Sequence, residues 1–211
     1  MFLMLEYNIS HKFITLTLLI FLIGCNQYNP EEESIAYKIE QFRIEKDRHF
    51  KNDGGSPLLP DDKSTFAGLA YFPIDLDYRF EGQISRYDSV IADTILGTGG
   101  ELRPATKFGY FEFVFQEKAH RLQVYKMAAM ANGVPAHLFL GFTDETRGVS
   151  TYGGGRYIDL EENAENFYVV DFNMAYNPYC VYNPEYSCAI PSAENHLPFA
   201  VKAGEKNYDG H

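Results

Sequence analysis

The apolar positions near the start of the chain recur at helical intervals over residues 31–52. One stripe consists of Ile35, Ile39, Phe42, Lys46 and Phe50, with Lys46 as its polar member. Acidic residues gather at the beginning of this segment and basic residues at its end, which suits the helix dipole. Residues 52–55, with the sequence Asn-Asp-Gly-Gly, then stop the pattern. We therefore predict one helix over residues 31–52 that lies on the domain.

Beyond residue 58 the pattern changes to short aromatic and β-branched runs separated by Gly, Pro and Asp. Within one run, Phe111, Phe113 and Phe115 alternate with Glu112 and Val114, which marks one buried face. The predicted strands span residues 67–73, 76–84, 89–96, 107–115, 121–127, 137–142, 156–160, 167–171 and 199–203. Many short strands without intervening helices predict a mainly β fold. We expect a compact antiparallel sandwich or barrel-like domain over residues 31–211, with the N-terminal helix packed on it.

The first 25 residues have the pattern of a processing segment. Lys12 precedes an apolar run over residues 13–23, which is too short to span a bilayer and suits a signal peptide. The run closes with Leu22-Ile23-Gly24-Cys25, which resembles the lipobox of bacterial lipoproteins. The resemblance implies a signal peptide over residues 1–24, a lipid-acylated Cys25, and a tether over residues 25–30. An ordinary cleaved signal with an incidental Cys is the alternative.

Two features after the lipobox bear on the location of the protein. Asn26 follows the acylated position, and by resemblance to Gram-negative lipoproteins this favours the outer membrane, on its periplasmic or its surface face. The acidic run over residues 31–33 resembles surface-export signals of some lipoproteins, and it also fits an ordinary solvated charge run. The membrane, reached through the acylated Cys25, is thus the first expected partner.

The charge of the chain excludes one class of partner. The formal net charge is −11, whereas a nucleic-acid-binding protein needs a basic surface to displace counterions. The 16 Tyr and 17 Phe residues favour strands, where aromatic rings fit a half-buried pleated surface.

The stretch from residue 141 to 206 carries a family resemblance. Its matching segments are 142–146 (FTDET), 151–157 (TYGGGRY), 171–178 (DFNMAYNP) and 203–206 (AGEK). This pattern resembles the bacterial and archaeal domain-of-unknown-function family 1684, over nearly the whole mature chain. The resemblance implies a shared fold and no reaction. Tyr179, Ala189 and Ser192 stand where the family favours Pro, which affects the stiffness of loops.

The same stretch holds the candidate binding residues. Asp144, Arg156 and Asp171 each sit where a predicted strand meets a turn, and the guanidinium of Arg156 suits a carboxylate or a phosphate. We expect Arg156 to pair with Asp144 or Asp171 at the border of a shallow polar cleft. The full set of candidate ligand-binding residues is Asp144, Tyr152, Arg156, Asp171, Asn173, Tyr176, Asn177 and Glu205. The alternative is a buried ion-pair network with a structural role.

Two functions follow from these residues. The first is a binding or structural lipoprotein with a small anionic or sugar ligand. The second is a hydrolase that uses the carboxylates of Asp144, Asp171 and Glu205, with Arg156 as an anion clamp. Ser150 and Ser187 lack the Gly-x-Ser-x-Gly elbow, and the Gly run over residues 153–155 lacks the spacing of a P-loop. No cofactor or metal is predicted, and the sequence assigns no oligomeric state.

Two cysteines remain once Cys25 is acylated. In an oxidising envelope the even pair Cys180 and Cys188 predicts a disulfide. Free buried thiols and a metal site with His196 are the alternatives, and the spacing does not match a zinc module.

The lipobox generates a direct test. Cys25→Ser removes the thiol that carries the lipid, so we expect the protein to leave the membrane fraction, because a stable anchor needs its acyl chains. Fractionation and mass spectrometry of the mature N-terminus measure this. Unchanged fractionation together with an unmodified N-terminus in the unmutated protein would contradict the prediction.

Overall fold

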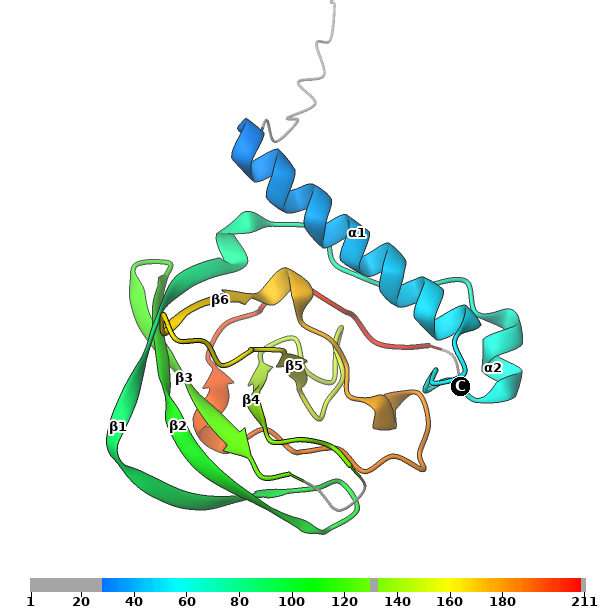
Figure 1. Ribbon diagram of the computed structural model, residues 1–211. Coiled ribbons are helices and arrows are strands. Elements are labelled where there is room, and N and C mark those ends of the chain that lie inside the picture. The colour runs from blue at the N-terminus through cyan, green and yellow to red at the C-terminus, as the bar shows by residue number, and fades with distance from the viewer. Residues whose placement is uncertain (1–27, 130–132, 210–211) are drawn as a thin grey trace, which may run out of the picture.

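The computed structural model of the protein describes residues 28–129 and 133–209. Its centre is a strongly curled antiparallel sheet, and one long helix, α1, packs at one side of it (Figure 1). The prediction of a mainly β, barrel-like domain with one N-terminal helix is therefore confirmed, and the sheet forms a half-barrel. The predicted signal peptide and Cys25 lie outside the described residues.

The strands follow one another around the sheet in the order β5-β4-β3-β2-β1-β6. Each pairs antiparallel with its neighbour, and β7 adds a short parallel pairing to β4. Their bounds are β1 Arg79–Leu96, β2 Leu102–Phe115, β3 Lys118–Met127, β4 His137–Asp144, β5 Arg156–Ile158, β6 Phe167–Asp171 and β7 His196–Leu197. The half-barrel stays open because β5 and β6 are its two edges.

The longest strand joins two predicted ones. Residues 76–84 and 89–96 were expected as separate strands, but β1 runs through both of them, and its pairing with β2 shifts register between Arg86 and Ile91. A long strand with a bulge bends more sharply than a regular one, which helps the sheet to curl. On β2, Phe111 and Phe113 are buried while Glu112 and Val114 are exposed, as their alternation predicts.

Two predicted strands do not form. Residues 67–73 and 199–203 run in extended loops whose backbone groups find partners outside a ladder. Tyr71 and Glu205 make one isolated bridge, and the N–H of Val201 donates to Asp144 Oδ1 at 3.1 Å. The prediction was wrong for both segments because an alternating apolar pattern indicates that one face is buried. It does not indicate which groups the backbone N–H and C=O are hydrogen-bonded to.

Helix α1 spans Pro30–Asn52, close to the predicted 31–52. The side chain of Asn29 caps the first turn by accepting hydrogen bonds from the N–H groups of Glu31 and Glu32, each at 3.0 Å. In return, the carboxylate of Glu32 accepts a hydrogen bond from the Asn29 N–H. A second helix, α2 (Pro60–Thr65), follows. Among the described residues, no helix combines the length and the apolar character needed to cross a membrane.

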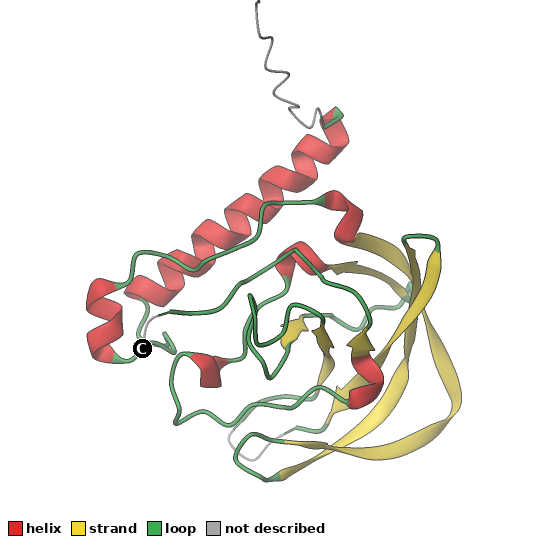
Figure 2. Ribbon diagram, turned by 180° about the vertical axis from the view of Figure 1, so that it is seen from behind, coloured by secondary structure: helices red, strands yellow, loops and turns green. Residues whose placement is uncertain are grey.

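The face of α1 that meets the domain is polar as well as apolar. Ile39 and Phe50 are buried there, and so is Arg43, which the apolar stripe did not predict. The guanidinium of Arg43 donates to the carbonyl oxygens of Phe72 at 3.0 Å and Asn173 at 3.2 Å. Figure 2 shows α1 away from the outer curl of the β1–β2 hairpin and beside the loops that end the chain.

The three glycines at 153–155 form a turn into β5, and they differ in what they require. Gly155 has a φ of +94°, and a Cβ there would lie 2.5 Å from the carbonyl oxygen of Phe142. Gly153 is exposed, lacks a positive φ, and has no atom closer than 3.8 Å to such a Cβ. The turn therefore depends on Gly155, and Gly153 is free to vary.

Substitution of these two glycines tests the turn. Gly155→Ala forces a strained φ and a backbone clash, so we expect it to lower the free energy of unfolding by about 1–3 kcal/mol. Gly153→Ala is the matched control, with an expected change within about 0.5 kcal/mol. Urea unfolding curves of both variants measure the difference. Equal effects of the two substitutions would contradict this account.

Candidate functional site

Arg156 is the largest of the fully buried side chains, with 1% of its surface exposed. Its Nη2 contacts Asp144 Oδ2 at 2.9 Å, so the ion pair forms with one of its two expected partners. The guanidinium also donates to three carbonyl oxygens of the last segment of the chain, those of Val201, Ala203 and Glu205. Burial lowers the pKa of Arg156, and the charge of Asp144 opposes that shift.

The other carboxylate expected near Arg156 belongs to a second network. Asp171 Oδ1 accepts hydrogen bonds from the backbone N–H and the side-chain amide of Asn173, both at 2.9 Å, and Asp171 Oδ2 lies 3.7 Å from Arg79 Nε. Asn173 in turn exchanges hydrogen bonds with the backbone of Asp75. As expected, Asp171 stands where a strand meets a turn: β6 ends there, and Asp171 caps the 3₁₀ helix Phe172–Met174 that follows.

Glu205 links the end of the chain to helix α1. Its Oε1 lies 2.5 Å from Lys46 Nζ, while its Oε2 accepts hydrogen bonds from the hydroxyl of Tyr182 at 2.6 Å and the N–H of Asn177 at 2.8 Å. The Lys46 ammonium also sits over the ring of Tyr176, at 4.4 Å from its centroid. A carboxylate with only 1% exposure is tolerated here because Lys46 supplies a cation and Tyr182 and Asn177 supply hydrogen-bond donors.

The eight candidate residues thus divide into two groups. Six of them are at most 6% exposed and are engaged with other protein groups: Asp144, Arg156, Asp171, Asn173, Asn177 and Glu205. Tyr152 and Tyr176 are partly exposed. The contacts of the six buried residues are structural, and their role as ligand-binding residues stays a prediction.

A large cavity lies beside this network, and of the eight candidates only Tyr176 lines it. Its volume is about 1140 Å³, slightly above the usual range of pockets that hold small ligands. One wall is the C-terminal half of α1, from Phe42 to Phe50. The others come from the adjoining ends of β2, β3, β4 and β5, and from loop residues 176–179 and 185–189. Because these segments lie far apart in the sequence, the cavity exists only in the folded chain.

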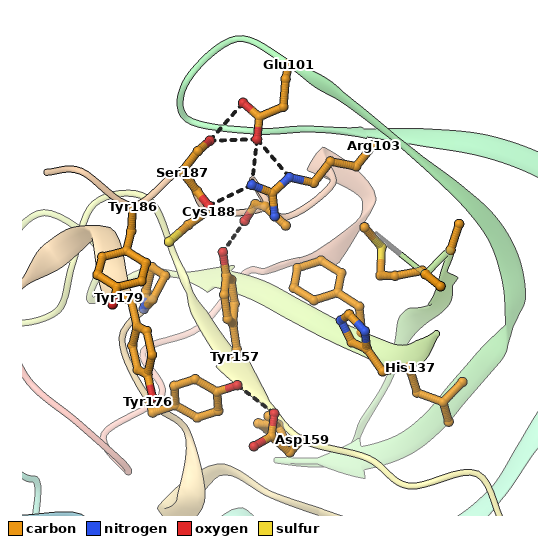
Figure 3. Close-up of a pocket in the computed structure, with 18 of the residues that line it drawn as sticks. Glu101, Arg103, His137, Tyr157, Asp159, Tyr176, Tyr179, Tyr186, Ser187 and Cys188 are labelled. Carbon is orange, nitrogen blue, oxygen red and sulfur yellow. Dashed lines mark hydrogen bonds and ion pairs between the residues drawn. The ribbon is translucent and has the colours of Figure 1, made fainter. Parts of the chain in front are cut away.

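Tyrosine rings form much of the wall of this cavity. Tyr157, Tyr176, Tyr179 and Tyr186 gather on one side in Figure 3. They pack edge to face, with centroids 5.8 Å apart for Tyr157 and Tyr176 and 5.4 Å apart for Tyr179 and Tyr186. Burial raises the pKa of three of these phenols, Tyr157, Tyr176 and Tyr179, so they stay protonated at neutral pH. The wall therefore offers ring surfaces and neutral hydroxyls.

The ionic groups of the cavity leave an excess of negative charge. Within the described lining, the Lys and Arg side chains are both paired with carboxylates: Lys46 with Glu205, and Arg103 with Glu101, whose Oε1 lies 2.8 Å from Arg103 Nε. Asp159 accepts only a neutral hydrogen bond from the Tyr176 hydroxyl, at 2.6 Å, and both Asp159 and Glu185 are exposed. The cavity is consequently suited to neutral or positively charged ligands more than to anions.

The two cysteines lie next to each other beside the cavity, and Cys188 lines it. Both are free thiols in this structure, and the N–H of Cys180 donates to Cys188 Sγ at 3.1 Å. Their proximity agrees with the pairing expected from the sequence, while the disulfide itself stays a prediction. No group of three or more His, Cys, Asp and Glu side chains in the described ranges could hold a metal ion.

One polar cluster escaped the sequence reasoning, which named His196 only as a ligand in an alternative metal site. The ring of His196 contacts the Thr143 hydroxyl at 3.1 Å through Nδ1 and Glu145 Oε1 at 3.2 Å through Nε2. The cluster forms because β7 pairs with the end of β4, a pairing between residues more than fifty positions apart. It does not line the large cavity.

Both the sequence and the fold of this chain resemble those of known proteins. The sequence matches a family described as "Protein of unknown function (DUF1684)" over residues 64–206. The fold is similar to the solution NMR structure of an uncharacterized protein from Haloarcula marismortui, with 31% sequence identity and a TM-score of 0.64. That match covers 86% of this chain and 98% of the other. No match was found among curated proteins.

The buried ion pair gives a prediction about stability. Arg156→Met leaves Asp144 and three carbonyl oxygens without their donor, so we expect a loss of about 3–5 kcal/mol in the free energy of unfolding. Arg147→Met is the matched control, because Arg147 is exposed in the turn that follows β4 and Asp144. Chemical denaturation measures both. A loss below about 1 kcal/mol for Arg156→Met would contradict the structural role.

Proposed function

The chain belongs to the family described as "Protein of unknown function (DUF1684)", and from this premise we propose that it is a binding protein, held at a membrane by an acylated Cys25, whose ligand occupies the cavity beside α1. The expected ligand is a small neutral or positively charged molecule with a flat apolar face, such as a sugar or an aromatic amine. The observation that carries the proposal is the combination of aromatic walls with carboxylates that no cation neutralises.

The walls support this ligand class through two interactions. Tyrosine rings attract cations placed over their faces and also pack against the apolar face of a sugar ring, and their hydroxyls accept or donate hydrogen bonds. Asp159 and Glu185 add charge that attracts an ammonium group or accepts hydrogen bonds from hydroxyls. An anion would meet these same carboxylates without an unpaired Lys or Arg among the described lining residues, so the anionic ligand expected from Arg156 is disfavoured in this cavity.

The membrane anchor rests on the N-terminal sequence and lies outside the described residues. It is supported by the lipobox that ends in Cys25. The capped start of α1 at Pro30 fits a tether that ends there. A tether of a few residues would then hold the domain close to the bilayer surface, with the cavity in the surrounding aqueous phase.

The hydrolase alternative gains no support from its named carboxylates. Asp144, Asp171 and Glu205 are 2%, 6% and 1% exposed, and each accepts hydrogen bonds or ion pairs from the protein. None of the three lines the cavity. General acid or base catalysis requires a carboxylate within hydrogen-bond reach of the substrate, which this arrangement does not provide.

Three compounds that share a phenyl ring and differ in charge test the ligand class. We expect benzyltrimethylammonium and benzyl glucoside to shift the NMR signals of the cavity tyrosines, and benzoate to leave them in place, because the apolar part is shared and only the polar part changes. The ring signals of Tyr157 and Tyr176 report on the cavity.

Charge removal gives the matched variants. Asp159→Asn should weaken benzyltrimethylammonium binding by roughly tenfold, equivalent to about 1.4 kcal/mol, while leaving benzyl glucoside within about twofold. Glu112→Gln, an exposed site on β2 outside the cavity, is the control and should change neither. Tighter binding of benzoate than of the cation, or equal effects of the two variants, would overturn the proposal.

A further inference from the structure

Cys180 and Cys188 form a thiol pair with two different environments. Cys180 lies in the 3₁₀ helix Tyr179–Val181 and is partly exposed, whereas Cys188 is 8% exposed at the cavity edge. The contact between the Cys180 N–H and Cys188 Sγ, at 3.1 Å, shows that the two residues are already adjacent. A partly exposed cysteine in contact with a buried one is the arrangement that thiol–disulfide exchange uses.

The polar groups around Cys180 favour its ionised form. Hydrogen bonds from the Cys188 thiol and, to a smaller extent, from Thr98 and Tyr152 lower the pKa of the Cys180 thiol to about 6, against the opposing effect of burial. The bond with Cys180 and burial raise the pKa of Cys188. At neutral pH the pair therefore favours a thiolate on Cys180 and a thiol on Cys188, and Cys180 is the more exposed of the two residues.

The buried partner is fixed in place by the hairpin that joins β1 and β2. The N–H of Cys188 donates to the Thr98 hydroxyl at 2.9 Å, and its carbonyl oxygen accepts from the Thr98 N–H at 2.8 Å. The neighbouring Ser187 carbonyl accepts from Arg103 at 2.6 Å. Cys188 is thus held on the hairpin while Cys180 lies on a separate 3₁₀ turn, so a bond between them would connect two distinct segments.

We propose that Cys180 and Cys188 are a thiol–disulfide exchange site whose substrate is a disulfide. The Cys180 thiolate attacks one sulfur of the substrate, so a mixed disulfide forms and the other substrate sulfur leaves as a thiolate. Cys188 then loses its proton to solvent and attacks Cys180 Sγ, which forms the Cys180–Cys188 disulfide and releases the second substrate thiolate. The substrate gains the two electrons that the pair loses.

The acidity of Cys180 separates this role from a permanent structural disulfide. A hydrogen-bonded thiolate stabilises the reduced form of the pair and is a good leaving group, so its disulfide is easier to reduce than a structural one. The exchange therefore runs in both directions through the same mixed disulfide, and the relative reduction potentials of pair and substrate set which direction prevails. The disulfide expected from the sequence is then one of two states of the pair. The exchange does not depend on the ligand of the neighbouring cavity, so the two proposals can fail separately.

The first experiment measures the acidity of Cys180. All chains carry Cys25→Ser, which leaves Cys180 and Cys188 as the two remaining thiols of the three in the sequence. The rate of alkylation of Cys180 by iodoacetamide should rise with a midpoint near pH 6 in the reduced parent chain. Cys188→Ala removes the donor and should move the midpoint to about 8.5. Cys188→Ser keeps a hydroxyl donor and should retain the lower midpoint. A parent midpoint at about 8.5 would overturn the proposal.

The second experiment traps the intermediate with glutathione disulfide. The reduced parent chain should lose two hydrogens in mass and carry no adduct, because Cys188 resolves the mixed disulfide. Cys188→Ser should retain one glutathione on Cys180, and Cys180→Ser should react at least tenfold more slowly. Thermal melting of each variant confirms that it is folded.

Two results of that trapping experiment would sink the exchange role. One is a parent chain that accumulates two glutathione adducts. The other is an oxidised parent chain in which reduced glutathione cleaves the disulfide only after the protein has been unfolded. A parallel run with a disulfide-bonded peptide shows whether the substrate disulfide is of the small-molecule or the polypeptide kind. Reaction with either supports the site, and reaction with neither overturns it.

Discussion

The buried ion pair between Arg156 and Asp144 holds together parts of the chain that no strand ladder connects. The last segment, residues 201–205, is extended but belongs to no strand ladder, and its only bridge in the described residues joins Glu205 to Tyr71. The guanidinium of Arg156 donates to three carbonyl oxygens of this segment, as a neighbouring strand would. Asp144 completes the arrangement by accepting the N–H of Val201. The Nη1 and Nη2 atoms of Arg156 are thereby hydrogen-bonded, while its buried Nε has no hydrogen-bond partner among the described residues. The ion pair with Asp144 and these bonds offset the cost of burying the charge.

This network also fixes the position of helix α1. Glu205 follows directly on the segment that Arg156 holds, and its carboxylate binds Lys46 of the helix, while Arg43 binds the carbonyl oxygen of Asn173. The helix thereby forms one wall of the cavity. The buried polar residues of the family stretch thus shape the candidate site indirectly, because they hold α1 in place against the rest of the domain. The tyrosines and carboxylates that line the cavity are the groups available to contact a ligand.

The cavity and the thiol pair share one element, the loop over residues 185–189. Cys188 belongs to the cavity edge, and the carbonyl oxygen of the next residue, Ala189, accepts the hydroxyl hydrogen bond of Tyr157. A covalent bond between Cys180 and Cys188 would tie this loop to the 3₁₀ turn that carries Tyr179. Exchange chemistry at the pair and occupancy of the cavity are separate proposals, but they act on the same wall.

The sequence by itself determined the elements whose signals are local. The helical stripe and its Asn-Asp-Gly-Gly stop located α1, and the alternation around Phe111 located a buried face. It also placed Arg156 beside a carboxylate, because a buried guanidinium requires one. Only the tertiary structure decided that the carboxylate is Asp144, that residues 199–203 are held by side chains instead of a strand, and that the cavity is walled by α1 and Tyr157. These outcomes depend on contacts between residues far apart in the chain, and a local period carries no information about the partner across such a distance.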